Sequence, residues 1–132
     1  MKALLLMIAG LPLVACGSDT PPTANAVLDA LKANGVPFGA VSYPKRKPLS
    51  LLPNTYKERV EVAFPSIAPK GGQFFVCETR EYCDHLQEHF HALRALAGPH
   101  VYRSKSGRVL AQLYSTLEQP VANQIRAAIE EL

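Results

Sequence analysis

The sequence predicts an α+β fold: a two-layer sandwich of a mainly antiparallel sheet with its helices on one face, in the order αβββαββα. Apolar residues recur at helical spacing at both ends and in the middle of residues 23–132. The stretches with strand-like alternation come in pairs joined by tight turns, which indicates hairpins. The chain has 132 residues, 48% of them hydrophobic and 19% charged, which favours one small folded domain over a disordered chain.

The first helix is expected over residues 23–34. Thr23 is a suitable N-cap, Val27 and Leu31 share one face, and Gly35 follows where helices commonly end. Residues 36–43 are expected to contain a short strand.

A long loop is predicted over residues 43–56. Three prolines in it enclose Lys45-Arg46-Lys47 and the apolar Leu49-Ser50-Leu51-Leu52. Loops of this length in small domains tend to carry function.

Two strands follow as a hairpin. From Tyr56, apolar Val60, Val62 and Phe64 alternate with charged residues, and Pro65 ends the strand. Pro69-Lys70-Gly71-Gly72 then turns the chain into the second strand, residues 73–77.

The main helix is predicted over residues 79–97, with Thr79 as its cap. Its apolar face is expected to hold Tyr82, Leu86, Phe90, Leu93 and Ala97. Strands at 100–103 and 108–114 are joined by a turn in which Gly107 takes the left-handed position. Pro120 opens the last helix, whose buried stripe is expected to be Val121, Ile125, Ala128, Ile129 and Leu132.

The N-terminus has the profile of an export signal. Lys2 precedes a short apolar run, which Gly10 and Pro12 interrupt, so residues 1–15 are predicted to be a signal peptide. The segment Leu13-Val14-Ala15-Cys16 resembles the lipobox of bacterial lipoproteins. This resemblance implies a diacylglyceryl group on the Cys16 thiol and cleavage by signal peptidase II before Cys16. Residues 16–22 would then be the lipidated cysteine and a flexible tether, and residues 23–132 the domain.

The predicted location is therefore the cell envelope, outside the cytoplasm and attached to the membrane by lipid. Gly17, and not Asp, follows Cys16, which by the sorting rule of that family favours the outer membrane in cells with two membranes. The alternative is an ordinary secretory signal in which Cys16 is incidental.

Cys77 and Cys83 remain as an even pair. In an oxidising compartment they are predicted to form a disulfide. The alternatives are two free thiols or a redox-active pair, but five intervening residues do not match the CxxC spacing of redox motifs.

A second resemblance covers residues 54–131. The succession of Gly71-Gly72-Gln73-Phe74-Phe75-Val76, a long helix and a Pro-started terminal helix is similar to a group of small, functionally uncharacterised bacterial lipoproteins. No motif in it is catalytic, and the Cys77/Cys83 pair departs from the pattern of that group.

His85 and His89 are the sharpest candidate for chemistry, because two histidines four residues apart on a helix can share one metal ion. The alternative is that they are ordinary boundary and surface residues of an amphipathic helix. The basic residues around Lys45-Arg46-Lys47 could attract anionic lipid headgroups or be a solvated loop. No module for nucleic-acid binding is recognised, so no nucleic-acid partner is predicted.

No GxSxG motif or phosphate-binding glycine loop occurs, and the chain is predicted not to be an enzyme and to need no cofactor. We expect a lipid-anchored interaction module that contacts an envelope protein through the loop and one exposed sheet face. One alternative is a metal or small-ligand binding lipoprotein that uses His85 and His89. Another is an anchored inhibitor or exclusion factor.

Overall fold

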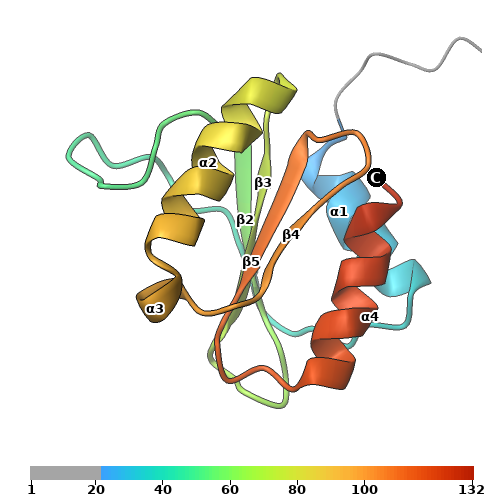
Figure 1. Cartoon of the computed structure of the whole chain (residues 1–132). Helices are drawn as coiled ribbons and strands as arrows, with labels where there is room; N and C mark the ends of the chain where they lie inside the picture. Colours follow the sequence, from blue (N-terminus) through green and yellow to red (C-terminus); the bar gives the residue numbers. More distant parts are fainter. Residues whose placement is uncertain (1–21) are drawn as a thin grey trace, which may run out of the picture.

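The structure of the protein is a computed structural model that describes residues 22–132. The predicted signal peptide and lipidation site, Cys16, lie outside the described residues. The elements in chain order are α1 (Ala24–Ala33), β1 (Val41–Ser42), β2 (Glu58–Ala63), β3 (Gly71–Val76), α2 (Arg80–Ala92), α3 (Arg94–Ala97), β4 (Val101–Arg103), β5 (Val109–Leu113) and α4 (Gln119–Glu130) (Figure 1). The predicted α+β class is confirmed, and the observed order differs from the predicted one only by the short helix α3.

The strands form one open antiparallel sheet in the order β1-β2-β3-β5-β4. β2 and β3 form one hairpin, and β4 and β5 form another. The two hairpins are joined where β3 pairs with β5, with Phe74 opposite Ala111. β1 and β4 are the edge strands of this sheet.

One face of the sheet carries the larger core. Phe74, Val60 and Leu113 pack there against α1 and α4, which lie on the same side of the sheet (Figure 1). The Thr23 side chain accepts a hydrogen bond from the Ala26 N–H, which confirms the predicted cap of α1. Val27 on α1 is fully buried, as its place on the predicted apolar face requires.

The opposite face carries a second, smaller core under α2. It comprises Tyr56, Phe75, Cys77, Cys83, Leu86, Phe90 and Leu110. The expectation that all helices lie on one face is therefore wrong, because the sheet stands between α2 on one side and α1 with α4 on the other (Figure 1). The physical reason lies in β3, where Phe74, Phe75 and Val76 are all apolar, so that both faces of the strand must be covered.

A disulfide fixes the start of α2 to the end of β3. Cys77 and Cys83 are at disulfide distance, with Cα atoms 5.7 Å apart, which agrees with the predicted pair. Thr79 caps α2 by accepting a hydrogen bond from the Tyr82 N–H. With Cys83 held against the sheet, Leu86 and Phe90 follow on the same helical face, and Tyr82 is turned outward with 46% of its surface exposed.

The predicted helix over residues 79–97 is divided in the structure. Leu93 has φ −102° and ψ 17°, which ends α2 and starts α3 in a new direction. Leu93 is 40% exposed, whereas the helical spacing predicts it on the buried face, so this part of the prediction is wrong. No helix between residues 22 and 132 combines the length and the apolar character needed to cross a bilayer.

Candidate functional site

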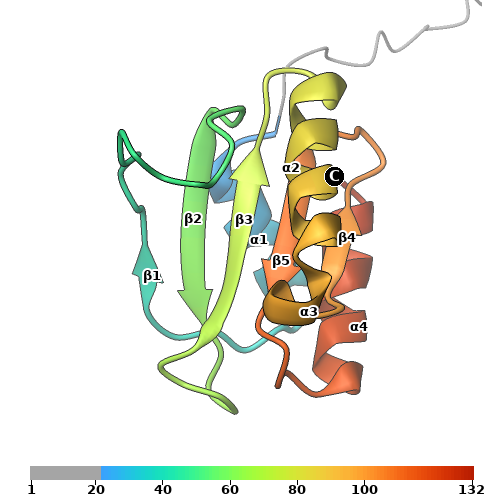
Figure 2. The same cartoon turned by 60° about the vertical axis from the view of Figure 1, so that its left-hand side comes forward.

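The second face of the sheet is only half covered. α2 lies over β5 and β4, and Arg103 holds it there, since its guanidinium pairs with Asp84 at 2.9 Å and donates to the Arg80 carbonyl at 2.7 Å. β1 and β2 lie beyond the reach of this helix, as Figure 2 shows. The sheet therefore presents an open surface next to α2.

Polar side chains from neighbouring strands line up on this open surface. The strand register places Glu61 opposite Gln73, and Gln73 opposite Gln112. Arg59 lies on the same face of β2 as Glu61, because strand side chains alternate. We call Arg59, Glu61, Gln73 and Gln112 the polar row.

The polar row is one continuous chain of hydrogen bonds. The Arg59 Nη2 lies 2.9 Å from the Glu61 Oε1 and 2.7 Å from the Gln73 Oε1. The Gln73 Nε2 donates to the Gln112 Oε1 at 2.8 Å, and the Gln112 Nε2 donates to the Ala97 carbonyl at 2.7 Å. Each member thus fixes its neighbour, so the row offers a partner polar groups whose positions are set in advance.

Arg59 is well enclosed for a charged group. Its side chain is only 19% exposed, and its guanidinium carbon lies 5.7 Å from the centre of the Phe75 ring. The ring and the side-chain amide oxygen of Gln73, which accepts from the Arg59 Nε at 3.0 Å, keep the cation in one orientation.

Two adjoining hollows flank the polar row. The first has a cavity volume of about 350 Å³ and lies over β1 and β2, where its lining includes Ser42 and Glu61. The second has a cavity volume of about 350 Å³ and lies between α3 and the end of β5. Gln73, Gln112 and Tyr114 line both, so the two hollows form one continuous surface.

The second hollow has an apolar border. Leu96 on α3 is 86% exposed, Leu93 is 40% exposed, and Tyr114 lies opposite them. We call Leu93, Leu96 and Tyr114 the apolar rim. Exposed apolar side chains that border fixed polar groups are the usual composition of a protein-binding surface.

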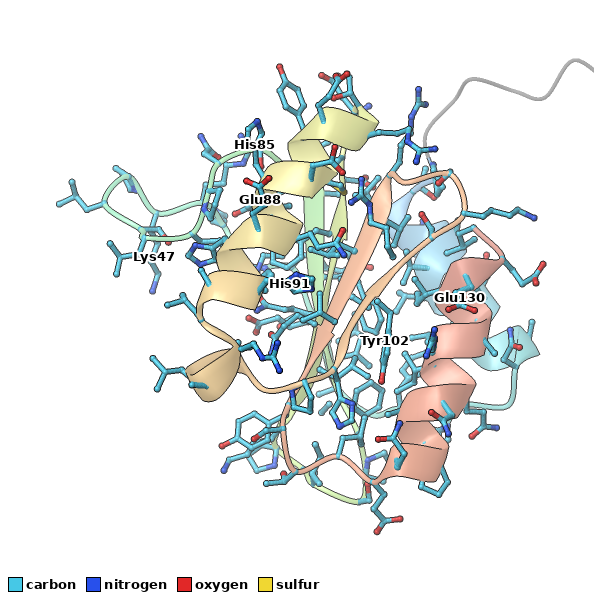
Figure 3. All side chains as sticks on the ribbon, viewed as in Figure 1. Lys47, His85, Glu88, His91, Tyr102 and Glu130 are labelled. Atoms are coloured by element: carbon cyan, nitrogen blue, oxygen red, sulfur yellow. A yellow bond between two sulfur atoms is a disulfide. The ribbon has the colours of Figure 1, made fainter. Side chains whose placement is uncertain are left out.

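The histidines proposed as metal ligands both lie on α2. His85 is exposed, and His89 is half-buried with its ring 5.3 Å from that of Phe90. A third histidine of this helix, His91, lies at a different height along it from His85 (Figure 3). Within residues 22–132, no three His, Cys, Asp or Glu side chains are grouped so that they could hold a metal ion.

Sequence reasoning named an exposed sheet face but assigned no residue of the polar row to a functional site. Arg59 and Glu61 were recognisable as the polar half of an alternating strand. Gln73 and Gln112 each adjoin apolar strand residues, a signal that becomes meaningful only when the pairing of β3 with β5 is known. Comparison with known proteins found no matching family model, no matching curated protein and no matching solved structure.

Proposed function

We propose that this protein is a lipid-anchored protein of the cell envelope that binds a partner protein on the open half of its second sheet face, without catalysis. The observation that carries the proposal is that residues of the polar row and of the apolar rim line the same two joined hollows. The anchor is supported by the resemblance of residues 13–16 to a lipobox. The Cys77–Cys83 disulfide supports an oxidising compartment.

The shape of the surface favours a protein over a small molecule. Both hollows are more open than enclosed, whereas small-molecule sites enclose most of their ligand. A partner segment could place an apolar side chain against Leu93 and Leu96 while its polar groups meet Gln73 and Gln112. Leu96 would then be the main anchor, since it has the most apolar surface to remove from water.

The proposal is tested by site-specific photo-crosslinking in intact cells. A photoreactive amino acid replaces Leu96 in one variant and Ala127 in a control. Both positions are exposed and helical, but Ala127 belongs to α4 on the other side of the sheet. We expect a defined envelope protein to be captured from position 96 and not from position 127, and the capture to be lost with Cys16→Ser.

Binding strength is then measured with purified components. Leu96→Asp is expected to weaken the complex by at least about thirtyfold, as loss of a central anchor does, and Ala127→Asp is expected to leave it unchanged. Equal capture from positions 96 and 127, or equal affinity of the two Asp variants, would refute the assignment of this surface.

A further inference from the structure

The loop between β1 and β2 has a fixed base. The Arg46 guanidinium carbon lies 4.7 Å from the centre of the Tyr56 ring, and Leu52 packs against the second core. The Thr55 hydroxyl donates to the Tyr82 carbonyl at 2.9 Å, which ties the end of the loop to α2. The loop is therefore held against the domain by contacts near both of its ends.

The tip of the loop projects into solvent. The Ser50 N–H donates to the Lys47 carbonyl at 3.1 Å, which closes a turn with Pro48 in its second position. Beyond the contacts of the base, Leu49 is 97% exposed and Leu51 is 93% exposed. Figure 3 shows Lys47 on this projecting part of the loop.

The charge around the tip has one sign. Residues 45–57 contain four basic residues, Lys45, Arg46, Lys47 and Lys57, and no acidic residue. Arg46 is engaged with Tyr56, which leaves the exposed Lys45 and Lys47 beside the two leucines. Leucines that can enter an interface, next to lysines that can meet phosphate groups, fit the surface of an anionic membrane.

The position of the tether supports the same partner. The Ala24 N–H, at the start of α1, donates to the Glu58 Oε2 at 2.8 Å, and Glu58 directly follows the loop. The loop tip and the start of α1 lie toward the same end of the sheet in Figures 1 and 2. From Cys16 to Thr23 the chain can extend at most about 25 Å, so a lipid on Cys16 would hold this end of the domain close to the membrane.

We propose that the tip of this loop is a second membrane contact, which docks on the anionic phospholipid surface that holds the lipid anchor. Leu49 and Leu51 enter the interface, and Lys45 and Lys47 lie at the phosphate groups. This inference rests on the anchor in the proposed function. Docking at two points would fix the orientation of the domain, because a tether alone leaves it free to rotate.

A tryptophan placed in the loop tests the contact directly, since the chain contains no tryptophan. The mature lipoprotein carrying Leu49→Trp is purified from bacterial membranes. It is then reconstituted into vesicles of phosphatidylcholine alone or of phosphatidylcholine with phosphatidylglycerol. The matched control is Leu96→Trp. It also replaces an exposed leucine, but one that lies on α3 and not in the loop.

We expect the emission of Leu49→Trp to shift to shorter wavelength in the vesicles with phosphatidylglycerol, and the shift to be reversed by high salt. The emission of Leu96→Trp should stay at long wavelength in both vesicles. Adding Lys45→Gln and Lys47→Gln should lower the docking equilibrium constant by about twenty-five-fold, since each basic side chain contributes about fivefold at an anionic surface. Lys32→Gln with Lys70→Gln, the same change of charge elsewhere in the domain, should leave it unaltered.

Flotation of the same samples separates the two proposals. A protein that does not float with phosphatidylcholine vesicles lacks the anchor, which would refute that part of the proposed function and the docking that depends on it. A protein that floats but gives identical Leu49→Trp spectra in both vesicles would overturn loop docking alone. That result would indicate that Leu49 and Leu51 contact a protein partner and not the membrane.

Discussion

Removal of the Cys77–Cys83 disulfide should lower stability by a calculable amount. The bond closes a loop with a sequence separation of six, and both cysteines are fully buried between the end of β3 and α2. In the chain-entropy model, a loop of this size contributes about 2 kcal/mol to the free energy of unfolding at 25 °C. For a domain of this length, that corresponds to a melting temperature lower by about 8 °C in the reduced protein.

The double variant Cys77→Ala/Cys83→Ala should lose more than the reduced protein. It loses the constraint, which contributes about 2 kcal/mol to the free energy of unfolding. It also loses the packing of two buried sulfur atoms, at about 1 kcal/mol each, so the total loss is about 4 kcal/mol. Thermal unfolding followed by circular dichroism, with the wild type refolded in reductant as the third sample, measures both steps. Reductant should not alter the double variant.

Two results would refute this reasoning. One is a melting temperature that differs by less than about 2 °C between oxidised and reduced protein. It would mean that the Thr79 cap and the strand already restrict the unfolded chain near α2, so that the disulfide removes little further entropy. Equal melting of the reduced protein and the double variant would mean that the sulfur atoms add nothing to packing.

Three further outcomes are expected. Phe75→Ala should lower the free energy of unfolding by about 3–5 kcal/mol in urea denaturation, because the fully buried ring is central to the second core; a loss below about 1 kcal/mol would contradict that role. Gly71→Ala should prevent correct pairing of β2 and β3, because a Cβ there would lie 1.7 Å from the Val62 carbonyl oxygen. An unchanged amide spectrum by NMR would disprove this clash. Zn²⁺ should leave the melting temperature unchanged, because no third ligand joins His85 and His89 within residues 22–132. Stabilisation by Zn²⁺ that His85→Ala abolishes would instead show a metal site.

The elements were largely predictable because their local signals are strong. Thr23 and Thr79 act as caps, and Gly35 and Gly107 have the positive φ values of 69° and 75° that their turns predict. The second helical layer was also signalled, since the unbroken run Phe74-Phe75-Val76-Cys77 has no solvent-facing position.

The rotation of α2 and the composition of the polar row were not predictable from local patterns. Tyr82 is exposed because the disulfide turns Cys83, its neighbour, toward the sheet. Gln73 and Gln112 meet only because β3 and β5 pair in one particular register across a long separation in the chain. Helical spacing and strand alternation carry no information on such distant pairing.

The pairing of β3 with β5 also determines when the sheet can form. β3 pairs with β2 on one edge, but on its other edge residues 72–76 pair with residues 109–113, which come after α2, α3 and β4 in the chain. Contacts of such long range make folding slow in comparison with local hairpins. For a chain that is exported unfolded with its N-terminus first, as the proposed anchor requires, the centre of the sheet could form only after residues 109–113 had crossed the membrane.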